Sequence, residues 1–232
     1  MTGLKRSDSL SYDLSELIHH AVLTPQIARS KFSQICNEVK NSGLSRLCTD
    51  LCGLKVAREL FGSDTHMRVF ALIAFPFGNL PTILKKMEIE YALENGADEI
   101  EIVPNFSFLE DKNTNRFAEE IADLCSYGVP VRAILNTYNL QKDIIQIAIE
   151  ALIDAGVRGI QNGNGFGPPV TASEIKMISK IVNSRISIKA VGGIKTLDNV
   201  IELIEAGANE IGTSNGISII KEAHKKINGK SK

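Results

Sequence analysis

Apolar residues recur along the whole chain in two alternating patterns. Short blocks rich in β-branched side chains are typical of buried strands, whereas longer segments carry apolar residues at the spacing of an amphipathic helix. The short blocks predict eight strands, at Leu17–Leu23, Ser45–Thr49, Arg68–Phe75, Glu99–Val103, Val131–Leu135, Gly159–Gln161, Ile186–Ala190 and Glu210–Thr213. The longer segments predict eight helices, at Ile27–Ser42, Leu54–Phe61, Leu80–Asn95, Asn115–Tyr127, Leu140–Ala155, Ala172–Val182, Leu197–Ala206 and Gly216–Lys226.

Each predicted strand is followed by one predicted helix, and several helices stop at a glycine, as at Gly96, Gly156 and Gly207. Crossover helices between buried strands imply a parallel sheet. Eight such units match an α/β fold of the (β/α)8 TIM-barrel type, whereas an open doubly wound sheet usually has about five to seven strands. We expect a single barrel domain at 13–226 between flexible ends at 1–12 and 227–232.

Composition narrows the class of protein. Of the 232 residues, 44% are hydrophobic, and 26 basic side chains nearly cancel 27 acidic ones, for a formal net charge of -1. Such a chain has no overall field that attracts nucleic acid or an anionic membrane. No segment approaches the roughly 20 apolar residues of a membrane span, and the first residues lack the apolar core of a signal peptide. We therefore expect a cytoplasmic protein that binds neither nucleic acid nor membrane.

The four cysteines, Cys36, Cys48, Cys52 and Cys125, are scattered, which favours reduced structural thiols. Cys48 and Cys52 have CxxxC spacing, which is neither the redox CxxC nor half of a zinc site with a second ligand pair. The chain is therefore expected to need no metal and no cofactor.

Glycines and hydroxyls follow the last two predicted strands, in ISIKAVGGIKT and EIGTSNGIS. Backbone N–H groups at such turns form a cradle for anions, and the last two strand-to-helix loops are the usual phosphate site of a barrel. The alternative is that these glycines only permit sharp turns. The phosphate candidates are Gly192, Gly193, Gly212, Thr213 and Ser214.

Two residue types stand out inside strands that are otherwise apolar. Lys189 alternates with Ile188 and Ala190, so its side chain is expected to point toward the barrel axis. It is either the partner of an inward carboxylate, for which Glu101 is the obvious choice, or an amine fit for proton transfer or imine chemistry. One of His19 and His20 could face the cavity, with a structural role as the alternative.

Five motifs carry a family likeness: FPFG at Phe75–Gly78, GADEIEIV at Gly96–Val103, GF at Gly165–Phe166, IKAVGGIKT at Ile188–Thr196 and IGTS at Ile211–Ser214. Through them the sequence resembles deoxyribose-phosphate aldolase, a class I aldolase barrel, along nearly its whole length. The resemblance implies a homodimer with a Schiff-base lysine on the sixth strand, a helper lysine on the seventh and an aspartate on the fourth. By motif, Lys189 matches the helper, Cys48 a pocket cysteine, and Gly192, Gly193, Gly212 and Ser214 the phosphate contacts.

The reaction centre departs from this family pattern. The sixth-strand motif, normally close to IKTSTGF, reads IQNGNGF, so that Gln161 stands at the position of the Schiff-base lysine. An amide nitrogen shares its lone pair with the carbonyl and cannot form an iminium ion with an aldehyde. Asn162 and Asn164 stand among the positions where threonine and serine are usual, and Glu101 stands for the aspartate. Further departures are His19, Ala21, Asp50, Asn136 and Val191.

Three hypotheses follow. In the first, a diverged family member binds a phosphorylated sugar or small phosphometabolite but lacks the ordinary cleavage of 2-deoxyribose 5-phosphate to glyceraldehyde 3-phosphate and acetaldehyde. In the second, the protein is an active aldolase with Lys189 as nucleophile and Glu101 as proton shuttle. In the third, it is a structural or interaction module without a ligand. The pocket is predicted to contain His19, Cys48, Asn162 and Asn164.

Overall fold

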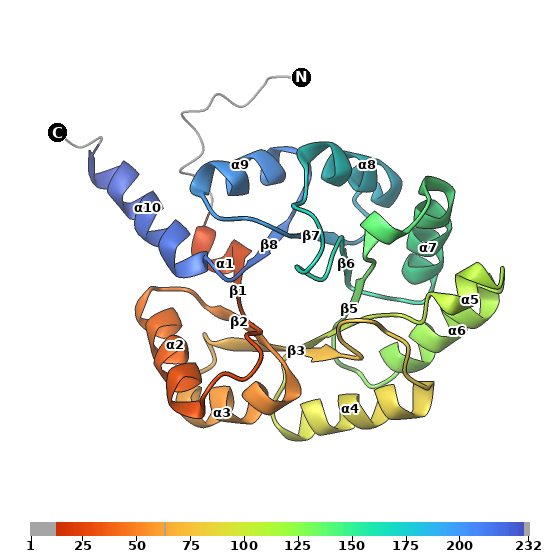
Figure 1. Cartoon of the computed structure of the whole chain (residues 1–232), viewed down its shortest axis with the longest axis horizontal. Helices are drawn as coiled ribbons and strands as arrows, with labels where there is room; N and C mark the ends of the chain where they lie inside the picture. The colour runs from red at the N-terminus through yellow and green to blue at the C-terminus, as the bar shows by residue number, and fades with distance from the viewer. Residues whose placement is uncertain (1–12, 63, 230–232) are drawn as a thin grey trace.

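Eight parallel strands close into a barrel in which each strand pairs with the next and β8 pairs with β1 (Figure 1). The computed structural model describes residues 13–62 and 64–229. The strands are β1 Ile18–Val22, β2 Arg46–Thr49, β3 Arg68–Ile73, β4 Glu99–Ile102, β5 Val131–Ile134, β6 Gly159–Gln161, β7 Ser187–Val191 and β8 Glu210–Thr213. The predicted (β/α)8 barrel is confirmed, and all eight predicted strands are present.

A ring of helices surrounds the barrel (Figure 1). They are α2 Arg29–Asn41, α3 Leu51–Phe61, α4 Thr82–Glu94, α6 Thr114–Cys125, α7 Lys142–Asp154, α8 Ala172–Val182, α9 Leu197–Glu205 and α10 Gly216–Gly229. Each corresponds to a predicted helix, and α10 runs three residues past the expected end at Lys226. Within the described ranges, no helix is long and apolar enough to cross a membrane. The segments 1–12 and 230–232, predicted to be flexible, lie outside the described residues.

Among the residues that the structure describes, three short elements were not predicted: α1 Leu14–Leu17, α5 Ser107–Glu110 and the 3₁₀ turn η2 Thr137–Asn139. Each spans about one turn, which is too short to show a helical period. Helix α3 begins three residues earlier than predicted because Asp50 caps it, accepting a hydrogen bond from the Gly53 amide at 2.7 Å. Local capping chemistry therefore sets a boundary that the apolar period does not show.

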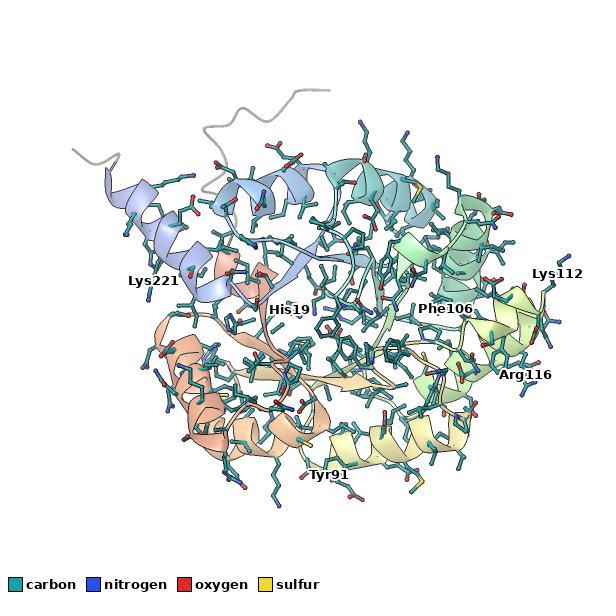
Figure 2. All side chains as sticks on the ribbon, in the orientation of Figure 1. His19, Tyr91, Phe106, Lys112, Arg116 and Lys221 are labelled. Atoms are coloured by element: carbon teal, nitrogen blue, oxygen red, sulfur yellow. The ribbon has the colours of Figure 1, made fainter. Side chains whose placement is uncertain are left out.

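The barrel interior has two parts. Near the carboxyl ends of the strands it holds a small apolar cluster of buried residues, Cys48, Phe70, Leu72, Val103 and Ile134. Beside and below this cluster the interior is charged, with buried glutamates, Arg132, Lys189 and His19. Figure 2 labels His19 near the middle of the barrel. Barrels are usually filled by branched aliphatic side chains, so this interior depends on paired charges to an unusual degree.

Candidate functional site

A cavity of about 450 Å³ opens at the carboxyl ends of the strands, where catalytic residues gather in barrels. Seven of the eight strands contribute to its wall, through Ala21, Cys48, Leu72, Glu101, Gln161, Lys189 and Gly212. Loop residues after β1, β3, β6, β7 and β8 complete the wall. The volume and the mixture of apolar walls with a few polar groups fit a small-molecule site.

Glu101 organises the floor of the cavity. Its Oε1 lies 2.5 Å from Nζ of Lys189, and its Oε2 accepts a hydrogen bond from the Cys48 thiol at 3.3 Å. All three side chains are buried. The ion pair between Lys189 and Glu101 that the sequence left as one of two alternatives is present.

The Cys48 thiol acts as a donor in this arrangement. Burial raises the pKa of Cys48 well above its ordinary value, and the negative charge of Glu101 raises it further. A thiol with a raised pKa stays protonated near neutral pH and is a poor nucleophile. Cys48 therefore holds Glu101 in place and does not itself offer a thiolate.

Gln161 ends β6 directly beside Lys189 on β7 in the strand register. Its Nε2 donates to the carbonyl oxygen of Gly163 at 2.6 Å, whereas its Oε1 has no hydrogen-bond partner. The side chain lines the cavity and is 3% exposed. The cavity floor thus presents a fixed carboxamide next to a lysine that is already paired.

The two predicted pocket asparagines have different places. Asn164 lines the cavity, and its Oδ1 accepts from the Phe166 amide at 3.0 Å. Asn162 donates to Glu174 at 3.0 Å and accepts from the Val191 amide at 2.8 Å. Asn162 therefore ties the β6 loop to α8 and β7, and it is not among the described residues that line this cavity.

All five predicted phosphate residues line the cavity. Gly192 and Gly193 have φ values of 128° and 65°, and a Cβ at either position would approach the segment 168–170 to about 3 Å. These two glycines thus meet a steric requirement of the turn. The Thr213 hydroxyl is buried and already donates to the Ile194 carbonyl at 2.7 Å. Ser214, in contrast, is exposed.

Lys195 also lines the cavity, and it was not predicted from the sequence. It is exposed and directly follows the turn formed by Gly192, Gly193 and Ile194. Its signal in the sequence was a basic residue after a glycine pair in the seventh loop. An exposed ammonium group beside a glycine turn favours an anion at that end of the cavity.

His19 lies below the cavity and does not line it among the described residues. Its ring packs on Phe70 with centroids 4.3 Å apart, and its two nitrogens lie 3.8 Å from Glu101 and from Glu210. Neither nitrogen has a hydrogen-bond partner. Burial lowers the pKa of His19 well below its ordinary value, and the positive charge of Lys189 lowers it further, so the ring is neutral.

Arg132 connects the cavity floor to the charged lower interior. Its guanidinium lies 3.3 Å from Glu99 and 3.8 Å from Glu101, and it donates to Glu210, which also pairs with Arg158 at 2.8 Å. Burial raises the pKa of Glu99. Burial also opposes ionisation of Glu210, but Arg132 and Arg158 outweigh it and lower the pKa of that carboxyl. Arg132 was not predicted from the sequence, although a charge inside the strand VRAIL was the available signal.

In the part of the chain that the structure describes, no group of three or more histidine, cysteine, aspartate or glutamate side chains is placed to hold a metal ion.

Comparison with known proteins identifies the family. No family model matches the chain. Over 212 residues the chain is 32% identical to deoxyribose-phosphate aldolase of Dictyoglomus turgidum, covering 90% of this chain and 96% of that protein. The solved structure of QR15, an aldolase, matches with a TM-score of 0.88 and 30% identity over 93% of this chain and 98% of that one.

The fold is also shared with a structure described as a unique tetrameric deoxyribose-phosphate aldolase from Aeropyrum pernix, with a TM-score of 0.84 and 20% identity over 97% of this chain and 100% of that one. From the match to the Dictyoglomus turgidum protein over 90% of this chain, we conclude that the chain belongs to the deoxyribose-phosphate aldolase family.

Proposed function

We propose that this protein is a diverged aldolase-family member that binds a phosphorylated sugar or small phosphometabolite and lacks the ordinary Schiff-base cleavage of 2-deoxyribose 5-phosphate. Gln161 carries the proposal, because by motif it stands at the place of the Schiff-base lysine, at the end of β6. Its nitrogen belongs to a carboxamide and cannot begin the covalent step. The protein either senses a metabolite or runs an altered reaction in the same cavity.

Binding of a phosphate group is supported by the composition of one cavity wall. The turns after β7 and β8 bring Gly192, Gly193 and Ser214 together, with Lys195 beside them. Backbone N–H groups in such turns and a nearby ammonium group are the usual partners of a phosphate. A wall of this kind is hard to reconcile with a module that has no ligand.

An active aldolase that uses Lys189 is the alternative. Lys189 and Glu101 stand together in the cavity, as a nucleophile and a proton shuttle would. However, the Lys189 amine is held at 2.5 Å by a buried carboxylate and would have to lose both its proton and this partner before attacking a carbonyl. Lys189 also lies on β7, whereas the family resemblance places the Schiff-base lysine on the sixth strand.

Reductive trapping separates the two. The protein is incubated with 2-deoxyribose 5-phosphate or acetaldehyde and reduced with borohydride, and its intact mass is measured by mass spectrometry. We expect no adduct, together with a rise in thermal midpoint in the presence of 2-deoxyribose 5-phosphate. A stable adduct that maps to Lys189, with turnover free of host enzyme, would establish the active aldolase instead.

A homodimer in the cytoplasm is the assembly that we propose, and helix α4 supports the dimer. This helix buries Lys85 against Glu120 at 3.1 Å and turns large apolar side chains outward. The outward set comes from α4 and the loop before it: Phe77, Ile83, Leu84, Met87 and Tyr91. Ile83, Met87 and Tyr91 follow one side of the helix at four-residue spacing. Such a stripe fits a two-fold contact, in which the same patch meets its own copy.

A further inference from the structure

We infer that Gln161 recognises its ligand through its carboxamide oxygen, which accepts a hydrogen bond from a hydroxyl group of a phosphorylated sugar held without a covalent bond. This inference rests on the proposed function, because it assumes that a phosphate ester enters the cavity. The inference assigns Gln161 a hydrogen-bond partner, which is a hydroxyl group of the ligand.

The carboxamide oxygen of Gln161 has an unmet requirement. Among the described residues that line the cavity, Gln161 is the one with a buried side-chain polar atom that has no hydrogen-bond partner. A buried acceptor without a donor costs free energy, and native proteins usually satisfy such groups. The unmet acceptor therefore points to a donor that enters with the ligand.

The rest of the floor cannot supply that donor without breaking existing contacts. Lys189 is paired with Glu101 at 2.5 Å, and the Cys48 thiol donates to the other oxygen of Glu101. The Gln161 nitrogen is held by the Gly163 carbonyl at 2.6 Å. Nitrogen and oxygen belong to one planar amide, so an oxygen that turns toward an entering hydroxyl takes the nitrogen away from Gly163, and the ligand contact replaces that hydrogen bond.

The missing donor defines the class of ligand. An aldehyde or ketone carbonyl has no hydrogen to donate, whereas a hydroxyl group donates readily. The cavity of about 450 Å³ has a phosphate-type wall on β7 and β8 and Gln161 on neighbouring β6. A sugar phosphate in ring form, or its reduced alcohol, is therefore the expected occupant, with a hydroxyl group at β6 where the family holds a carbonyl carbon.

Isothermal calorimetry with three probes tests the inference. Inorganic phosphate reports the phosphate wall alone, ribitol 5-phosphate adds hydroxyl groups without any carbonyl, and pentyl phosphate has the same chain length without hydroxyl groups. The wild-type protein should bind ribitol 5-phosphate about tenfold more tightly than pentyl phosphate, as expected when a hydrogen-bonding site meets a ligand that lacks the hydroxyl. This comparison needs no variant and so does not depend on the folding of one.

The variant Gln161→Met removes the acceptor at similar size. It should weaken ribitol 5-phosphate binding about three- to tenfold and leave inorganic phosphate binding unchanged. Gln146→Met, at an exposed glutamine on α7, is the matched control and should change neither affinity. Equal affinity of the wild type for ribitol and pentyl phosphates, or an unchanged Gln161→Met, would refute the role of Gln161 while leaving phosphate binding intact. Failure of all three probes to bind would refute the proposed function itself.

Discussion

Nζ of Lys189 and Oε1 of Glu101 face each other at 2.5 Å across the barrel interior, from β7 to β4. Each side chain is at most 2% exposed, so water screens this pair very little. Glu101 also has Arg132 at 3.8 Å and the Cys48 thiol, whereas Lys189 forms an ion pair with Glu101 alone among the described residues. The two members of the pair therefore depend on each other unequally.

This inequality predicts asymmetric losses of stability. Glu101→Gln leaves a buried ammonium group without its partner and should lower the free energy of unfolding by about 3–5 kcal/mol. Lys189→Met leaves a carboxylate that still has Arg132 and Cys48 nearby, so its loss should be smaller. Urea unfolding of both single variants and of the double variant measures the difference. Equal losses from the two single variants would contradict the arrangement.

The second prediction concerns the introduction of an amine at Gln161. Gln161→Lys would place an amine beside Lys189 on the neighbouring strand, and two adjacent cations favour the neutral, nucleophilic form of one of them. After incubation with acetaldehyde and borohydride, the variant should gain an adduct of one acetaldehyde equivalent that the wild type lacks. Gln146→Lys on the exposed face of α7 controls for nonspecific reduction. Absence of an adduct would mean that the cavity floor does not support imine chemistry.

Stability should fall as the solution becomes acidic. Burial lowers the pKa of His20 from 6.5 to about 4, and its Nδ1 has no hydrogen-bond partner. Between these two pH values His20 is protonated in the unfolded chain but not in the folded protein. Its contribution to the free energy of unfolding is therefore complete above about pH 6.5 and is lost as the pH drops toward 4. His19 acts in the same direction. The loss assigned to His20 is on the order of 3 kcal/mol.

Urea unfolding at pH 7.5, 6 and 5 measures this dependence. His20→Gln should flatten the slope of unfolding free energy against pH, whatever its effect on absolute stability. His66→Gln removes a histidine with an exposed side chain and should leave the slope of the wild type. A slope that His20→Gln does not change would contradict the assignment.

The exposed apolar face of α4 predicts that a charge placed on it will dissociate the proposed dimer. Met87 is 56% exposed in the middle of the apolar stripe, and Met87→Lys would place a charge at the proposed two-fold contact. Sedimentation should then show a dimer for the wild type and a monomer for the variant. Ile147→Lys makes the same kind of change on α7, where the side chain is also exposed, and should leave the dimer unchanged. A monomeric wild type would refute the contact.

The sequence revealed the strands because parallel strands buried on both faces carry nearly continuous apolar runs, as at 68–73 and 131–134. It also located Lys189 and Glu101, since a charge inside such a run is conspicuous. Single turns such as α1 and η2 were missed because one turn has no period. Local patterning was therefore sufficient for the architecture and for the strongest individual signals.

Arg132 shows why the rest of the site could not be predicted. Its contact with Glu210 joins positions 78 residues apart, which depends on the register of the four consecutive strands from β5 to β8. A shift of one residue in any of them would turn the carboxylate away. The orientation of His19 beneath the cavity has the same origin, because its neighbours come from β3, β4 and β8.

Gly212 has a consequence for the lysine on the strand next to it. A methyl group at this position would come within 2.7 Å of Cε of Lys189, so the absence of a side chain on β8 creates the channel through which the lysine stem reaches inward. The position of the Lys189 ammonium group thus depends on Gly212 as much as on the rotamer of Lys189 itself. Even alanine at 212 would force that stem to shift and would reshape the chamber without altering any charge.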